Sequence, residues 1–134
     1  MNLFVDTSVW SLAFRRDALA ETPHSRRLRD ALAGEETIVV TGVVLQELLQ
    51  GFHGPKASAR IVTLFSALPL VRPTLEDHVE AARLRNNCRR RGVQLGTIDA
   101  LIAELCVRHD LHLLTADRDF ERAAAYCPLK LAPV

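Results

Sequence analysis

The sequence predicts an α/β fold of three layers, in which a mainly parallel sheet of five strands is flanked by helices, as a single domain over residues 1–134. Short apolar runs alternate with helical patterns along the whole chain. Several runs are apolar at successive positions, as expected for strands that helices cover on both faces. The length of 134 residues, 49% of them hydrophobic and 25% charged, suits a globular domain with a true core.

The five predicted strands are the short apolar runs bounded by polar residues, glycine or proline. They are placed at Asn2–Val5, Thr37–Thr41, Pro69–Arg72, Leu111–Thr115 and Leu129–Pro133.

The helices between these strands have recognisable ends. Thr22 is expected to cap a helix that ends at Gly34. Thr74 begins a longer helix with the spacing of a capping box, and Gly92 ends it. Thr97 is expected to cap the helix that follows. Because helices separate successive strands, the connections are expected to be right-handed crossovers.

Composition excludes several classes of protein. No apolar run approaches the ~20 residues that cross a bilayer, and no basic leader precedes the first strand, so a cytoplasmic chain is expected. The three cysteines, Cys88, Cys106 and Cys127, are odd in number and widely spaced. Buried reduced thiols are therefore expected in place of disulfides or a zinc site.

Acidic residues gather where the predicted fold brings distant segments together. Asp6 ends the first strand, and Asp117 and Asp119 follow the fourth within a few residues. Glu47 lies on the helix that leaves the second strand, and Asp99 lies in the first turn of a later helix. Parallel strands present their carboxyl ends at one edge of the sheet, where α/β proteins bind ligands. These five carboxylates are expected to approach one place.

Each acid has an ordinary explanation when taken alone, as a helix cap, a first-turn partner of the helix dipole, or a solvated turn residue. Together they would repel one another, by roughly 4 kcal/mol for a pair about 4 Å apart. A cluster of this kind needs protons or cations. An all-oxygen ligand set favours a hard ion, Mg²⁺ or Mn²⁺, whose bound waters supply a nucleophile for phosphodiester hydrolysis.

Four segments, "VDTSVW", "LQELLQG", "GTIDALIA" and "TADRDF", resemble in order and separation the signature segments of PIN-domain ribonucleases. The resemblance spans nearly the whole chain and is greatest to the VapC-type toxins. It implies that the metal-site and catalytic acids are Asp6, Glu47, Asp99 and Asp117, with Asp119 as an additional or outer ligand. It also implies that small hydroxyl residues neighbour the site, namely Thr7, Ser8 and Thr115.

The same resemblance implies a Mg²⁺- or Mn²⁺-dependent endoribonuclease that forms a homodimer. In that family, the enzyme is the toxin of a type II toxin-antitoxin system. A small cognate antitoxin neutralises it by placing its C-terminal segment across the active-site groove.

Net charge becomes informative once these acids are assigned to a metal. Setting the five aside leaves 11 acidic residues against 17 basic ones, so RNA would meet a moderately basic surface. The candidate RNA-binding residues are Arg15, Arg16, Arg89, Arg90 and Arg91. The other candidates, Arg26, Arg27, Arg29, Arg83 and Arg85, can equally form solvated helix faces or pair with acids.

Other chemistries lack their motifs. The chain has no glycine-rich phosphate loop, no nucleophile-elbow serine and no His-Glu-x-x-His. "VDTS" lacks a second aspartate two residues after Asp6, which argues against an aspartyl-phosphate enzyme. The remaining alternative to a nuclease is a non-catalytic PIN-like module that binds RNA or protein.

Overall fold

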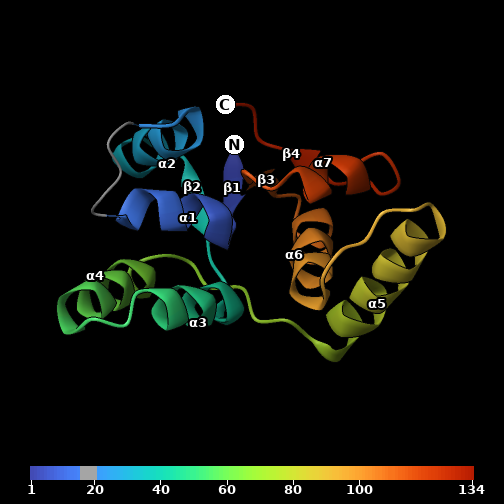
Figure 1. Ribbon diagram of the computed structural model, residues 1–134, viewed down its shortest axis with the longest axis horizontal. Helices are drawn as coiled ribbons and strands as arrows, with labels where there is room; N and C mark the ends of the chain where they lie inside the picture. The colour runs from blue at the N-terminus through green and yellow to red at the C-terminus, as the bar shows by residue number, and fades with distance from the viewer. Residues whose placement is uncertain (16–20) are drawn as a thin grey trace.

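The computed structural model describes residues 1–15 and 21–134, and Figure 1 shows their arrangement. The strands are β1 (Asn2–Val5), β2 (Thr37–Val39), β3 (His112–Leu114) and β4 (Lys130–Leu131). The helices are α1 (Thr7–Phe14), α2 (Pro23–Ala33), α3 (Gly42–Gly51), α4 (Pro55–Ser66), α5 (Leu75–Arg90), α6 (Thr97–Arg108) and α7 (Arg118–Ala123).

The sheet of the described residues has the order β2-β1-β3-β4, and every pairing in it is parallel. Phe4 of β1 pairs with Val39 of β2 on one side and with Leu113 of β3 on the other. The central strands are almost wholly buried, as the uninterrupted apolar runs predict. The α/β class with a parallel sheet is confirmed, and all strands end at a common carboxyl edge.

The prediction of a fifth strand at Pro69–Arg72 is wrong in extent. Within the described chain this segment makes only a single bridge, between Leu70 and Val40 at the β2 edge of the sheet. Two backbone hydrogen bonds hold the bridge, from the Val40 N–H to the Pro69 carbonyl (2.9 Å) and from the Val71 N–H to the Val40 carbonyl (2.8 Å). Pro69 and Pro73 have no N–H to donate, so the ladder does not continue in either direction.

The strands lie between two groups of helices: α1 to α4 gather on one side in Figure 1, and α5 to α7 on the other. Trp10 of α1 is buried, donates its indole N–H to the Val5 carbonyl (3.1 Å) and packs against Phe65 of α4, with ring centroids 4.9 Å apart. These contacts hold the start of α1 rigidly against the end of β1.

The predicted helix ends are mostly confirmed. The Thr22 and Thr74 side chains accept from the backbone three residues on, in capping boxes. Gly92 follows α5 with a φ of 83°, a left-handed conformation that favours glycine. Thr97 is the first residue of α6 and does not cap it; the N-cap is Gly96, against which the Asp99 carboxylate lies, and a Cβ at Gly96 would lie 3.5 Å from Asp99 Oδ2.

Two expectations from composition can be compared with the structure. Among the described residues, no helix combines the length and the apolar character needed to cross a bilayer. The three cysteines are free thiols; Cys88 and Cys106 are buried and Cys127 is half-buried.

Candidate active site

Asp6 occupies the first position beyond β1, at the carboxyl edge of the sheet. Its backbone N–H donates to the carbonyl of Leu114, the last residue of β3, over 3.1 Å. It is also the N-cap residue of α1, although its side chain makes no capping hydrogen bond. The side chain is only 5% exposed. The backbone of Asp6 is thus fixed beside the end of β3, and its carboxylate does not cap α1.

A network of hydroxyl groups holds the Asp6 carboxylate. Ser8 donates to Oδ1 (2.5 Å) and Thr115, which follows β3, donates to Oδ2 (2.7 Å). The two hydroxyl oxygens accept in turn from backbone N–H groups, Ser8 from Ala116 and Thr115 from Asp117, each over 3.0 Å. Because every donor in this network has its own fixed partner, the orientation of the carboxylate is defined on both sides.

Glu47 is held in the same manner from another element. It lies half-buried in the middle of α3, and its Oε1 accepts a hydrogen bond from the Thr7 hydroxyl over 2.7 Å. Thr7 is the first residue of α1, directly after Asp6. The hydrogen bond from Thr7 to Glu47 therefore joins α3, which follows β2, to the start of α1, which follows β1. It brings a second carboxylate to the carboxyl edge.

Asp99 lies half-buried in the first turn of α6. Its pKa is raised from 3.8 to about 6, first by burial and then by the negative charges of Asp117, Asp6, Glu47 and Asp119, in that order. Charges act at this strength only over short distances. The five acids singled out in the sequence are therefore brought into one electrostatic neighbourhood from four separate segments.

The pKa of Asp6 is also raised, chiefly by burial, with a smaller contribution from the charge of Asp117. Hydrogen bonds from Ser8 and Thr115 act in the opposite direction without cancelling the effect of burial. Like Asp99, Asp6 lies in an environment that disfavours its own negative charge.

Asp117 and Asp119 differ from each other in their surroundings. Asp117 is the N-cap residue of α7, and its Oδ1 accepts from the Asp119 N–H over 2.9 Å. The Asp119 side chain is 43% exposed and pairs with Arg122 over 2.8 Å. Asp117 thus belongs to the inner part of the cluster, whereas Asp119 lies at its exposed rim.

These residues suit a hard divalent cation by their chemistry, since they offer carboxylate oxygens backed by hydroxyl groups. Among the described residues, no three acidic, histidine or cysteine side chains converge closely enough to ligate one ion. A Mg²⁺ site does not need three, because Mg²⁺ keeps several waters and commonly takes one or two carboxylates. Burial raises the pKa of Asp99 and the charges of neighbouring acids add to it, and a bound cation would relieve that repulsion.

The candidate RNA-binding arginines divide into two groups. Arg89, Arg90 and Arg91 are exposed at the end of α5, and the Arg91 guanidinium lies 5.7 Å from the centre of the Tyr126 ring. Arg15 is exposed just after α1, and Arg16 lies outside the described residues. By contrast, most of the arginines for which ion pairing was the alternative do pair with acids: Arg26 and Arg29 with Glu21, Arg27 with Glu36, and Arg83 with Glu80. Arg85 differs, since among the described residues it pairs with no acid and donates to the Leu95 carbonyl.

Thr41 is a polar residue near the site that the sequence did not single out. It follows β2 by two residues, as Asp6 follows Phe4, and Phe4 pairs with Val39, so the same register leads from Asp6 toward Thr41. Thr41 is 1% exposed, and its hydroxyl has no hydrogen-bond partner in the part of the chain that the structure describes. Its place as the polar last residue of the strand predicted at Thr37–Thr41 was the signal that could have drawn attention to it.

Fold and site together define an α/β protein with a cluster of carboxylates at the carboxyl edge of a parallel sheet. The chain belongs to the PIN domain family, whose profile matches residues 3–126.

The chain is similar along its whole length to individual members of this family. Ribonuclease VapC11 of Mycobacterium tuberculosis strain H37Rv and VapC ribonuclease Mb1587 of Mycobacterium bovis are each 28% identical to it over 134 residues, 97% of both chains.

Solved structures share its fold. A chain of VapBC2 from Rickettsia felis, bound to a DNA fragment from its promoter, matches with a TM-score of 0.74 and 21% identity, covering 98% of each chain. VapC20 of Mycobacterium tuberculosis, a toxin that cleaves the sarcin-ricin loop, matches with a TM-score of 0.71 and 18% identity, covering 95% of this chain and 98% of the other.

Proposed function

We propose that the protein is a metal-dependent endoribonuclease and the toxin component of a type II toxin-antitoxin system. The observation that carries the proposal is that hydroxyl groups hold two carboxylates, Asp6 and Glu47, at the edge of the sheet where α/β proteins bind ligands. Burial, and then the charges of four neighbouring acids, raise the pKa of Asp99, as is common at functional sites. Relatives matched over 97% of the chain are named ribonucleases, which supports the same activity.

The residues that would hold the metal are Asp6, Glu47, Asp99 and Asp117, with Asp119 in an outer position. A bound Mg²⁺ or Mn²⁺ would supply Lewis acidity at the phosphodiester and a water of lowered pKa. Ser8 and Thr115 each occupy one side of an Asp6 oxygen, so the remaining lone pairs are free for a ligand. Thr7 orients Glu47 in the same manner. These hydroxyl groups pre-organise the carboxylates and reduce the cost of arranging them when substrate binds.

Arg89, Arg90 and Arg91 would supply affinity for the phosphate backbone. They are exposed at the end of α5, and the short connection that follows leads directly into α6, which carries Asp99. Such contacts are independent of sequence and weaken with salt. RNA bound here would therefore reach the acids from the α5 side.

A small antitoxin is the proposed protein partner, and a homodimer is the proposed assembly. Structures with this fold include toxin-antitoxin complexes such as VapBC2 of Rickettsia felis. The presence of a short gene for a DNA-binding protein immediately upstream would support the first proposal, and sedimentation of the purified protein tests the second.

The activity is tested by comparing Asp6→Asn with the wild-type protein in an RNA cleavage assay with Mg²⁺ or Mn²⁺. Cleavage by the wild-type protein should stop on addition of EDTA and resume with excess metal. Asp6→Asn should reduce cleavage at least about a thousandfold, because it removes the most rigidly held charge of the site. Glu35→Gln is the matched control, since Glu35 is an exposed acid that precedes β2 at the opposite edge of the sheet.

Undiminished cleavage by a folded Asp6→Asn protein would refute the assignment. Wild-type protein that binds RNA and cuts none with either metal would instead identify the non-catalytic module.

A further inference from the structure

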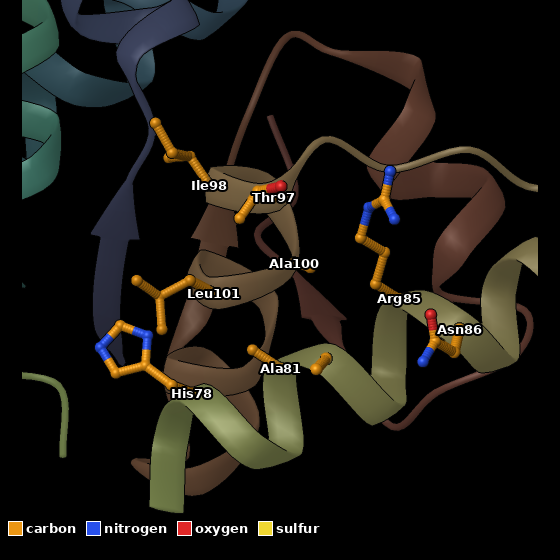
Figure 2. A pocket seen from close by; sticks show the side chains of 9 residues that line it. His78, Ala81, Arg85, Asn86, Thr97, Ile98, Ala100 and Leu101 are labelled. Carbon is orange, nitrogen blue, oxygen red and sulfur yellow. The ribbon is translucent and has the colours of Figure 1, made fainter. Parts of the chain in front are cut away.

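A pocket of about 420 Å³ lies between α5 and α6, outside the carboxylate cluster. Figure 2 shows that Arg85 and Thr97 lie at the end of the pocket where α6 begins, and that His78 lies at the opposite end. The volume is within the range of pockets that bind small organic ligands. The side chains of α5 and α6 that line this pocket do not fill it.

The lining combines a small apolar floor with a polar rim. The floor includes Ala81 and Ala100, whose side chains are short enough to leave a flat surface, and Leu101 closes one wall. Arg85 and Asn86 belong to the rim. An apolar floor with a few directed polar groups is the composition expected of a site for a planar, partly polar ligand.

Arg85 is the positively charged residue of this rim, and it is held in place. Its Nε–H donates to the Leu95 carbonyl over 2.8 Å, and among the described residues no acid pairs with its guanidinium. The neighbouring Arg83, by contrast, pairs with Glu80 over 2.5 Å, and Arg108 pairs with Asp77 over 2.6 Å. The two terminal nitrogens of Arg85 are therefore available as a fixed bidentate donor.

The pocket adjoins the acid site through α6. Thr97 and Ile98 line it, and Asp99 is the next residue of the same helical turn. A strand of RNA whose phosphate lies at the carboxylates can therefore place a neighbouring nucleotide between α5 and α6.

We propose that this pocket receives a purine nucleotide of the RNA next to the scissile phosphate, with Arg85 and Asn86 reading the base. The inference rests on the proposed ribonuclease function and adds a specificity site to it. Arginine recognises the O6 and N7 atoms of guanine, and asparagine recognises the N6 and N7 atoms of adenine. The N7 atom is an acceptor that guanine and adenine share and pyrimidines lack, so either side chain can donate to a purine there, and unstacked RNA bases present this edge to proteins.

The pocket is tested first by binding, with no need for catalysis. GMP, AMP, CMP and UMP are titrated into the full-length protein, and binding is followed by NMR chemical shifts. The variant Ala82→Leu fills the pocket from an exposed helix position, and Arg85→Gln removes the charged donor. Ala82→Ser and Arg83→Gln are the matched controls, since the first leaves the pocket open and the second removes one positive charge from the same helix outside it.

Wild-type protein should bind the two purine nucleotides more tightly than the pyrimidine nucleotides. Ala82→Leu and Arg85→Gln should each weaken purine binding about tenfold or more, and the two controls should stay within about twofold. Equal binding of all four nucleotides, or unchanged purine binding in both test variants, would overturn the proposal. A change from dimer to monomer caused by Ala82→Leu would also overturn it and would identify the pocket as a contact between copies of the chain.

Cleavage of an RNA library with random sequence separates this proposal from the general function. Loss of a purine preference beside the cut in Ala82→Leu, with cleavage retained, supports the pocket. Efficient cleavage with no base preference in the wild-type protein refutes the pocket and leaves the ribonuclease intact. Purine binding without any cleavage by the wild-type protein refutes the ribonuclease and retains the pocket.

Discussion

The two edges of the sheet treat their acidic residues in opposite ways. At the amino edge, the carboxylate of Glu36 accepts hydrogen bonds from both terminal nitrogens of Arg27, at 2.6 and 2.8 Å. Asp110 pairs with Lys130 at 2.6 Å. The hydrogen bond from Arg27 holds the pKa of Glu36 below its ordinary value, and that from Lys130 does the same for Asp110. These acids are matched to cations and contribute to the fold.

At the carboxyl edge, Asp6 and Glu47 accept hydrogen bonds from hydroxyl groups and Asp99 lies near other acids, while Asp119 is the acid there that pairs with an arginine, Arg122, among the described residues. Asp6 is held by Ser8 and Thr115, and Glu47 by Thr7. Burial raises the pKa of both Asp6 and Asp99, and the charges of the neighbouring acids add to it. In the described part of the chain, cations pair with the acids of the amino edge and with neither Asp6 nor Asp99. A site that destabilises its own charges without a ligand is typical of function rather than of stability.

The largest expected effect is the loss of activity in Asp99→Asn. The change keeps the size of the side chain and removes its charge, so cleavage of RNA should fall at least about a thousandfold with either metal. The same variant should be no less stable than the wild-type protein in EDTA, because it relieves repulsion among the acids. Thermal unfolding checks the second expectation, and a marked loss of stability would place Asp99 among the residues that support the fold.

A smaller effect, on stability, is expected where a buried acid is paired. Asp77 is 1% exposed; burial raises its pKa, but hydrogen bonds from Thr74 and Arg108 lower it further, to below its ordinary value. Asp77→Ala removes both the capping box of α5 and the ion pair with Arg108, so unfolding should cost about 2–3 kcal/mol less. Urea unfolding measures the change. A variant as stable as the wild-type protein would show that α5 does not depend on this contact.

The pH dependence of stability should distinguish the carboxyl edge from the amino edge. Asp99 has a folded pKa of about 6 against an ordinary value of 3.8, so between those values the folded protein binds a proton that the unfolded chain releases. Its contribution to stability is therefore present at low pH and lost as the pH rises from about 4 to 6. Allowing for solvent screening at a half-exposed group, the loss over this range should be about 1 kcal/mol smaller in Asp99→Asn than in the wild-type protein, while the contribution of Asp6, whose pKa is also raised, remains in both. Unfolding in EDTA across this range measures it.

The smallest effect is expected at the amino edge. The pKa of Glu36 is lowered, so its contribution is present above the ordinary value of 4.5 and is lost as the pH falls through the lowered pKa. Glu36→Gln should reduce the free energy of unfolding by about 0.5 kcal/mol at neutral pH, and the difference from the wild-type protein should vanish in acid. RNA cleavage should not change. A large loss of cleavage would mean that the two edges are not separate in function.

Local features of the sequence predicted much of the fold. The capping threonines Thr22 and Thr74 act on residues three positions away, so the signal and its effect lie together in the chain. The predicted strand at Pro69–Arg72 fails because strand formation depends on a partner, and Pro69 and Pro73 lack the donors that would extend it. The predicted cap at Thr97 fails by one position, since α6 begins at Thr97 and its N-cap is Gly96, which has no side chain to signal the cap.

The sequence alone determined which acids stand at strand ends, because the apolar runs and the polar residues that end them are local and their order along the chain is fixed. Tertiary structure decided which of those acids pair with a cation among the described residues. The Thr115 hydroxyl reaches Asp6 from 109 residues away, and Thr7 reaches Glu47 from 40 residues away. Charge pairing depends on distance in space, so composition could not show that Arg27 lies beside Glu36 while Asp99 lies beside other acids.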